Sequence, residues 1–272
     1  MNRFAQVMAR TPVGRKAIST IARSTLGRHF LDQVDPLQRI FSSVDEARRS
    51  VERLRFGGHE HPDAISLHTE LAADLRPSDY PALYWMQRIE GPLRIFDFGG
   101  NIGNLYYSYQ QYLSNRADLA WTVYDLPAVV AAGRRIAQER HAQFLHFTDR
   151  PEADAQTTLL LVSGALHYWE QSVEAMLDRI AIRPSHILVN RTPMHERQRQ
   201  YVTVQRQQHY AVPCVVRNAQ EMVKEFEALG YEMINKWPVL ELAVNLPFYP
   251  DWSVPRYSGF YFRRREGNPL AS

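Results

Sequence analysis

The stretch Leu93–Tyr107, which reads LRIFDFGGNIGNLYY, decides the fold of this 272-residue chain. Its apolar start predicts a short buried strand that ends at Asp97, and three glycines follow at Gly99, Gly100 and Gly103. The residues after the glycines are compatible with a helix. A strand, a glycine-rich turn and a helix in this order are typical of a nucleotide-type cofactor site at the start of a βαβ unit. Glycines let the backbone approach a ligand, and the N–H groups at the helix start point into the same space.

The residues after this stretch alternate between expected strands and helices. Further strands are predicted over residues 120–124, 143–147, 157–163, 186–190, 231–237 and 257–264. The last of these has no helix before it, so it is expected to pair antiparallel with a neighbour. The pattern predicts an α/β domain with a mostly parallel, seven-stranded sheet and an antiparallel last strand.

The first 90 residues are expected to form a helical extension ahead of this domain. Helices are predicted over about 44–55 behind the capping box Ser43–Glu46, from Pro62 to before Pro77, and from Pro81 to before Gly91. The chain therefore divides into an extension at 1–90, a cofactor-binding domain at 91–265 and a tail at 266–272.

Residues 1–31 form a distinct basic segment. They hold six of the 32 basic residues and no acid, and their apolar residues recur at roughly helical spacing. A basic amphipathic helix of this kind can lie on an anionic membrane surface. An acid-free start rich in Arg and Ser also resembles an organelle transit peptide, and a terminal helix packed on the protein surface explains the same pattern. Peripheral membrane contact through residues 1–31 is thus one of three interpretations.

The composition excludes several classes of protein. With 45% hydrophobic and 22% charged residues, the chain is typical of a globular protein that buries a core. The single cysteine, Cys214, excludes an internal disulfide and fits a reducing compartment. No apolar run approaches the roughly 18 residues of a membrane span, and no secretory signal peptide is visible. We therefore expect a cytoplasmic protein, at the inner membrane face if residues 1–31 contact lipid.

Nucleic-acid binding and metal binding are not expected. Beyond residue 31 the chain carries three more acidic than basic residues, which does not fit a nucleic-acid-binding surface. His59-Glu60-His61 places three potential metal ligands in a row, but a tripeptide cannot easily turn all three onto one ion. No other Cys or Asp cluster completes such a site with convincing spacing. The sequence leaves the oligomeric state open.

Two acids indicate which cofactor the glycine loop binds. Dinucleotide dehydrogenases carry G-x-G-x-x-G after the first strand, and Gly99–Gly103 lacks the middle glycine. Asp97, two residues before the first glycine, suits a cationic ligand without a phosphate. Asp125, at the end of the second strand, is placed to accept hydrogen bonds from both hydroxyls of a ribose. Together they favour S-adenosylmethionine over NAD.

Several motifs carry a resemblance to a known family. Asp97–Gly103 resembles the first motif of class I S-adenosylmethionine-dependent methyltransferases, with Asn101 at a position that is often glycine. Asp125-Leu126-Pro127 resembles the second-strand motif of small-molecule O-methyltransferases, and Leu166–Trp169 resembles the Leu-His-x-Trp that follows their fourth strand. With Asn190–Pro193 and the C-terminal strand, the pattern looks closest to a group of bacterial methyltransferases without an assigned substrate, which are often linked to surface-polysaccharide genes.

The resemblance implies a Rossmann-like methyltransferase fold with an N-terminal helical extension. It also implies methyl transfer from S-adenosylmethionine, with O-methylation of a small molecule or a surface-glycan precursor. A catalytically inactive binding module with this fold remains the alternative because of Asn101, and an NAD(P)-dependent oxidoreductase is a further one.

The candidate cofactor-binding residues follow the first four predicted strands. They are Asp97, Gly99, Gly100, Asn101, Gly103, Asp125, Leu126, Phe147, Thr148, Ser163 and Gly164. Phe147 and Thr148 are natural neighbours of an adenine ring, although Phe147 also fits a core position. Ser163 and Gly164 leave room beneath a cofactor because they are small.

Three residues are candidates for catalysis. His167 and His195, after the fourth and fifth strands, are rival general bases, since their ordinary pKa suits proton removal near neutrality. Arg191 is a candidate for holding an anionic acceptor and equally for a plain salt bridge. The polar region 195–217 is interpreted either as a lid on the acceptor side or as a solvated helix face.

Overall fold

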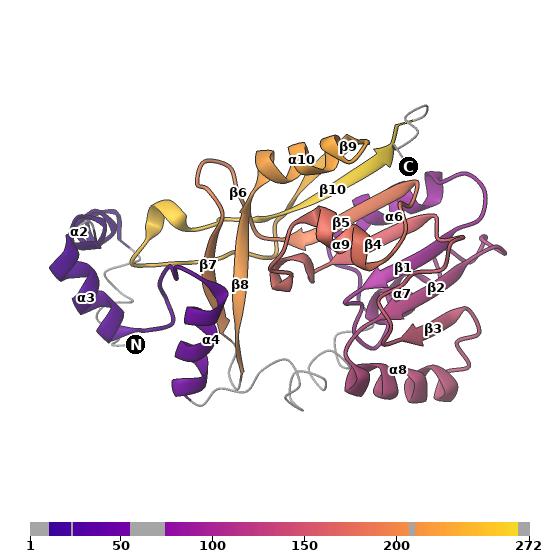
Figure 1. The fold of residues 1–272 in the computed structure, drawn as a ribbon, viewed down its shortest axis with the longest axis horizontal. Helices are drawn as coiled ribbons and strands as arrows, with labels where there is room; N and C mark the ends of the chain where they lie inside the picture. Colours follow the sequence, from indigo (N-terminus) through magenta and orange to yellow (C-terminus); the bar gives the residue numbers. More distant parts are fainter. Residues whose placement is uncertain (1–10, 23, 55–73, 207–209, 266–272) are drawn as a thin grey trace.

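The computed structural model describes residues 11–22, 24–54, 74–206 and 210–265. A seven-stranded sheet in the order β3-β2-β1-β4-β5-β10-β9 forms its centre (Figure 1). The strands are β1 (Arg94–Phe98), β2 (Ala120–Tyr124), β3 (Leu145–Thr148), β4 (Leu159–Ser163), β5 (His186–Thr192), β9 (Tyr231–Val239) and β10 (Tyr257–Arg264). Only β10 runs antiparallel to the other six strands of this sheet. The predicted mostly parallel sheet with an antiparallel last strand is confirmed.

The sheet is central because its middle strands are apolar on both faces. Leu159–Val162 of β4 are fully buried, as expected for a parallel strand covered on both sides. One face packs against helices α6 (Asp79–Arg88) and α7 (Asn104–Tyr109). The other face packs against α9 (Val173–Arg179) and α10 (Ala219–Ala228), and α8 (Pro127–Glu139) follows β2 beside β3.

Local signals explain where these helices begin. The Asn218 side chain accepts hydrogen bonds from the N–H groups of Gln220 and Glu221 and caps α10, as the sequence predicts. Pro127 occupies the first position of α8, where its missing N–H costs nothing. The helix predicted to begin at Pro81 begins two residues earlier, at Asp79, so Pro81 lies in its first turn, where proline is tolerated.

A second, three-stranded sheet lies beside the first. It consists of β6 (Met194–His195), β8 (Ala211–Asn218) and β7 (Tyr201–Arg206), with β7 and β8 antiparallel. The interpretation of residues 195–217 as a solvated helix face is therefore wrong. Val202 and Val204 of β7 and Val215 of β8 pack against the helix α4 (Val44–Arg53), and such β-branched residues favour a strand over a helix.

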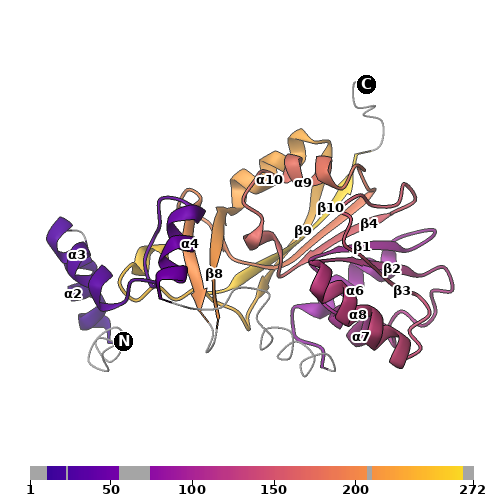
Figure 2. The same ribbon diagram turned by 60° about the horizontal axis from the view of Figure 1, so that its bottom comes forward.

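The described part of the N-terminal region is mostly helical. Helices α2 (Pro12–Ala22) and α3 (Thr25–Val34) lie at the end of the molecule opposite to β1–β3 (Figures 1 and 2). The predicted helix behind Ser43 is α4, whose first turn is capped by the Ser43 side chain through the N–H of Glu46. The helix predicted from Pro62 and the tripeptide His59–His61 lie outside the described residues.

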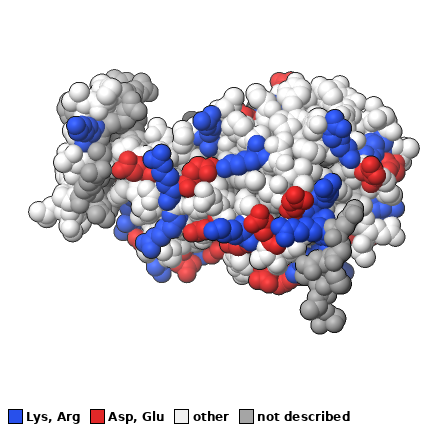
Figure 3. Space-filling model, turned by 90° about the horizontal axis from the view of Figure 1, so that it is seen from above, with Lys and Arg blue, Asp and Glu red and all other residues white. Residues whose placement is uncertain are grey.

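Basic and acidic side chains are intermingled on the face shown in Figure 3, and no basic patch stands out there. Two short 3₁₀ helices, η1 (Leu166–Tyr168) and η2 (Pro250–Trp252), complete the fold. Within the described part of the chain, no helix is both long and apolar enough to cross a membrane.

Candidate active site

A cavity of about 820 Å³ opens at the carboxyl ends of β1, β2 and β4 and extends to the β7–β8 hairpin. This is the edge at which open α/β sheets bind ligands, and the volume lies within the range of small-molecule sites. We call the part beside the glycine loop the loop half; it is lined by Phe98–Asn101, Tyr124–Leu126 and Ser163–Ala165. The part beside the hairpin is the hairpin half; its lining includes Arg76, Arg191, Gln205, Arg206, Tyr210 and Tyr257.

The glycine loop turns sharply at the end of β1. Gly99 has φ 72°, in the left-handed region that favours glycine, and a Cβ on it would lie 2.6 Å from the Cβ of Ala165. Gly100 lies directly over the Asp97 carboxylate, with which a Cβ would also collide. Gly99, Gly100 and Asn101 line the cavity, whereas Gly103 stands back from it at the start of α7. The loop therefore presents backbone to the cavity, as the sequence predicts.

Asn101 holds the loop in the conformation expected of glycine. Its φ is 56°, and asparagine tolerates the left-handed region better than most other non-glycine residues. Its side-chain Oδ1 accepts the N–H of Ile102 at 2.7 Å, and its own N–H donates to Oδ2 of Asp125 at 2.8 Å. The departure from glycine at this position thus leaves the loop geometry intact.

Asp125 lies at the mouth of the loop half. Its Oδ1 accepts the N–H of Leu126 at 2.7 Å, and its Oδ2 accepts the N–H of Asn101. Burial raises its pKa, and the two backbone hydrogen bonds act against that shift. Each carboxylate oxygen retains a second lone pair that can accept a hydroxyl donor. Leu126 is partly exposed beside it and adds an apolar surface to the same wall.

Asp97 lies beneath the loop and not in the cavity wall. It is 1% exposed, and Nε1 of Trp121 donates a hydrogen bond to its Oδ2 at 3.0 Å. Burial raises its pKa to about 7; the Trp121 hydrogen bond lowers it, and the charge of Asp125 raises it further. The sequence places Asp97 among the cofactor-binding residues, but in the structure its carboxylate supports the glycine loop from below and does not line the cavity.

Phe147 and Thr148 do not reach the cavity. Phe147 is buried at the end of β3, where its ring fills the space over Gly103 and Gly133. Neither residue is among those that line the cavity, whereas Val129 at the start of α8 is. Of the two positions that the sequence allows for Phe147, beside the cofactor or in the core, the structure shows the core position.

His167 and His195 lie in different surroundings. His167, in η1, is 3% exposed and lines the cavity, with its ring 4.1 Å from that of Tyr168. His195, in β6, does not line it. Nδ1 of His195 accepts the N–H groups of Arg197 and Gln198, and Nε2 bonds to the carbonyl oxygen of Asp251. Burial lowers the pKa of His195. Of the two rival bases, only His167 lies at the cavity.

Arg191 forms a buried ion pair. Its side chain is 13% exposed and its guanidinium donates to both oxygens of Asp79, at 2.6 and 2.7 Å. Its Nε donates to the hydroxyl of Ser78 at 3.1 Å, and its φ of 52° is unusual for a residue other than glycine. Arg191 lines the hairpin half, and the salt-bridge interpretation is the one observed.

The hairpin half contains polar residues that sequence reasoning missed. The hydroxyl of Tyr168 donates to Oε1 of Gln205 at 2.6 Å, and Nε2 of Gln205 donates to the oxygen of Tyr257 at 2.5 Å. Burial raises the pKa of both phenols well above the ordinary range, so both keep their protons near neutrality. No motif marks these residues, because they lie on η1, β7 and β10 and meet only through side-chain contacts in the folded protein.

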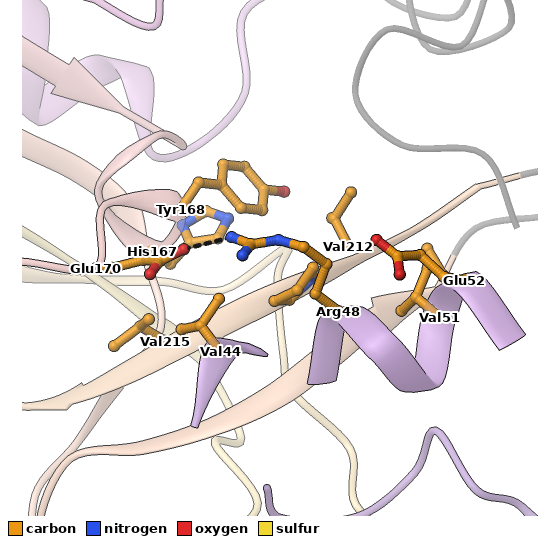
Figure 4. Close-up of a pocket in the computed structure, with 11 residues that line it drawn as sticks. Val44, Arg48, Val51, Glu52, His167, Tyr168, Glu170, Val212 and Val215 are labelled. Atoms are coloured by element: carbon orange, nitrogen blue, oxygen red, sulfur yellow. Dashed lines mark hydrogen bonds and ion pairs between the residues drawn. The ribbon is translucent and has the colours of Figure 1, made fainter. Parts of the chain in front are cut away.

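A smaller cavity of about 370 Å³ lies behind this wall, between α4, β8 and η1. Its floor is apolar, with Val44, Val51, Val212 and Val215, and Arg48 pairs with Glu170 across it at 2.7 Å (Figure 4). His167 and Tyr168 line both cavities and so separate them. The described residues contain no group of three His, Cys, Asp or Glu side chains that could hold a metal ion.

Comparisons with known proteins identify the fold. No protein-family model and no curated protein matches this sequence. The solved structure of the glycopeptide N-methyltransferase MtfA complexed with S-adenosyl-L-methionine superimposes with a TM-score of 0.51 at 10% identity, over 71% of this chain and 97% of that one. The structure of LepI complexed with the same compound gives a TM-score of 0.52 at 11% identity, over 94% and 70%. This protein therefore has the fold of the class I S-adenosylmethionine-dependent methyltransferases.

Proposed function

We propose that this protein binds S-adenosylmethionine in the loop half and transfers its methyl group to a small acceptor in the hairpin half. The observation that carries the proposal is Asp125, whose two oxygens are held by backbone N–H groups and keep lone pairs toward the cavity. This arrangement suits the two hydroxyls of a ribose. Gly164 supports the same fit, since open space lies where its side chain would be. The fold of the structural neighbours agrees with it.

The residues of the chain have separate tasks in this reaction. When bound, S-adenosylmethionine supplies a methyl group that positive sulfur activates for in-line displacement. Asp125 and the backbone of Gly99–Asn101 bind and orient the donor, which is the main contribution a protein makes to such a transfer. His167 accepts the proton of an acceptor hydroxyl. Tyr168 and Tyr257 keep their protons near neutrality, so they donate hydrogen bonds and do not act as bases.

We further propose O-methylation of a small molecule or a surface-glycan precursor. The hairpin half supports this because phenol, amide and guanidinium groups surround it, which is the chemistry that binds several hydroxyls at once. A binding module without turnover is the alternative. Release of S-adenosylhomocysteine with a panel of sugar and phenol acceptors distinguishes the two.

Calorimetry tests the cofactor assignment. We expect S-adenosylmethionine and S-adenosylhomocysteine to bind, and NAD not to bind. Asp125→Ala is expected to weaken the binding of S-adenosylhomocysteine by roughly a hundredfold or more, since two hydrogen bonds to a charged group are lost and each contributes about 1.5–3 kcal/mol. Asp149→Ala is the matched control, because Asp149 follows β3 as Asp125 follows β2 but is exposed and does not line the cavity. Unchanged binding by the Asp125 variant contradicts the assignment, and binding of NAD alone favours an oxidoreductase.

A membrane role for the N-terminal segment is proposed on separate grounds. Helices α2 and α3 expose four large apolar side chains, Val13, Ile21, Leu26 and Phe30, of which Leu26 is 86% exposed. The same segment contains no acid before Asp32. Exposed apolar residues among cations match an anionic lipid surface, where both the buried apolar area and the charge contribute to binding. We propose that residues 1–31 hold the protein against such a surface.

Vesicle sedimentation tests this contact. The full chain is expected to sediment with vesicles that contain phosphatidylglycerol and much less with phosphatidylcholine alone. The double variant Leu26→Glu/Phe30→Glu is expected to lose at least about tenfold in binding, because each buried side chain of this size contributes about 1.5–3 kcal/mol. Leu240→Glu, which changes a leucine after β9 that is as exposed as Phe30, is the control and should bind normally. Equal sedimentation of both variants contradicts the proposal.

A further inference from the structure

The carboxylate of Asp79 has no remaining capacity for hydrogen bonds. Its Oδ1 accepts from the hydroxyl of Tyr109 at 2.5 Å and from Arg191 at 2.6 Å. Its Oδ2 accepts from Arg191 at 2.7 Å and from the backbone N–H of Arg76 at 2.8 Å. A carboxylate offers about four lone-pair sites, so these four donors occupy it completely. The guanidinium of Arg76 therefore cannot donate a hydrogen bond to Asp79.

Arg76 has an unusual position beside this ion pair. Its side chain is half-buried and lines the hairpin half of the cavity. Its guanidinium makes no hydrogen bond or ion pair with any residue that the structure describes. Desolvation lowers the pKa of Arg76, and the neighbouring charge of Arg191 lowers it further. A guanidinium carries five N–H donors, and leaving it half-buried without an acceptor costs free energy.

Two other acids near Arg76 do not supply the missing hydrogen-bond acceptor. Glu241 accepts the hydroxyl and the N–H of Ser78. It makes no ion pair with Arg76, although its charge partly offsets the shift in the arginine pKa. Asp74, two residues before Arg76, is exposed at the rim of the cavity. Asp79 compensates the charge of Arg191, so the uncompensated positive charge on this wall is that of Arg76, whose unpaired hydrogen-bond donors favour an anion.

We propose that the acceptor carries a carboxylate or a phosphate group and that the guanidinium of Arg76 binds this group in the hairpin half. The inference deepens the methyl transfer proposed above and rests on it. A planar guanidinium pairs with either anion through two parallel N–H···O bonds. Arg191 is a weaker candidate for binding this group, because Asp79 compensates its charge and occupies its Nη2. The acidic group of a uronic acid or of a sugar phosphate has this chemistry.

Titrations of the full chain with inorganic phosphate, D-glucuronate and neutral D-glucose test the site, with S-adenosylhomocysteine both absent and present. Binding is followed by ligand-observed NMR. The wild type is expected to bind both anions at least about tenfold more tightly than glucose. Arg76→Gln is expected to remove this preference, and Arg76→Lys to retain part of it, since lysine keeps the charge but not the planar fork. Arg88→Gln is the matched control, because Arg88 ends α6, is exposed, and lies over the ring of Tyr84 outside the cavity.

The outcomes separate this inference from the proposed function. Binding of S-adenosylhomocysteine without any preference for the anions overturns the anion site and leaves methyl transfer standing. Preference for the anions that depends on Arg76, without binding of S-adenosylhomocysteine, supports the site and contradicts the cofactor assignment. An Arg76→Gln variant that binds phosphate as the wild type does also overturns the inference. A thermal unfolding curve of each variant verifies that the fold is retained.

Discussion

Replacing Asp79 by alanine is expected to destabilise the protein by about 3–5 kcal/mol, the usual cost of removing one partner from a buried ion pair. Asp79 is 1% exposed, and its loss leaves the guanidinium of Arg191 and the hydroxyl of Tyr109 in the interior without their acceptor. Asp79→Asn retains an oxygen for part of this network and is expected to cost less. The effect is large because one carboxylate joins α6, α7 and β5.

Urea unfolding of the two variants measures this effect. Asp74→Ala is the matched control: Asp74 lies in the same segment but is exposed, so its replacement is expected to change the free energy of unfolding by less than about 0.5 kcal/mol. A change of similar size in the Asp74 and Asp79 variants contradicts the role assigned to the buried pair. The double replacement Asp79→Leu/Arg191→Met is expected to recover much of the loss, because no charge then stays unpaired.

Asp97→Asn is expected to stabilise the protein at pH 8 by about 4 kcal/mol. Burial raises the pKa of Asp97 from its ordinary 3.8 to about 7. Between these two pH values the folded protein keeps a proton that the unfolded chain has released, so the contribution of Asp97 to stability falls as the pH rises. Above pH 7 the full difference is present, at about 1.4 kcal/mol for each unit of pKa. Asparagine does not ionise, and its oxygen can still accept the Trp121 hydrogen bond.

Unfolding curves at pH 5 and pH 8 test whether the contribution of Asp97 to stability falls as the pH rises. The gap in stability between Asp97→Asn and the wild type should widen by about 3 kcal/mol between these two pH values. Asp149→Asn, at an exposed position, is expected to leave the pH dependence of the wild type unchanged. A gap that is equal at both pH values shows that Asp97 titrates normally in the folded protein. The predicted loss of stability implies that Asp97 supports the conformation of the glycine loop at the expense of the stability of the whole protein.

The loop half could be predicted because its signals are local. Strand, glycine turn and helix lie within Leu93–Tyr107, and Asp125 follows the next strand directly. Each signal depends on neighbours a few residues away, so periodicity and turn chemistry suffice. The sequence also predicts Phe147 and Thr148 at the cavity, because they too come at the end of a strand. That rule does not account for Gly103 and Gly133, which leave the space that the Phe147 ring fills in the core.

The hairpin half could not be predicted because its contacts are distant in the chain. Arg191 and Asp79 are 112 residues apart, and Gln205 meets a tyrosine 52 residues further on. The many Gln and Arg residues around the hairpin also make this region polar overall, so its composition does not reveal the valines of its strands. Whether a charged residue will face solvent, a partner or a ligand depends on tertiary pairing, which periodicity does not report.

The two halves of the cavity differ in how the chain builds them, and this bears on how the protein folds and diversifies. The loop half comes almost entirely from one continuous stretch, residues 94–169, whereas the hairpin half is assembled from separate segments around Arg76, Arg191, Gln205 and Tyr257. Contacts between distant segments close long loops and form late in folding. The loop half can therefore be complete before the hairpin half exists. Insertions or substitutions in the later segments can change which acceptor is recognised and leave the site for the donor intact.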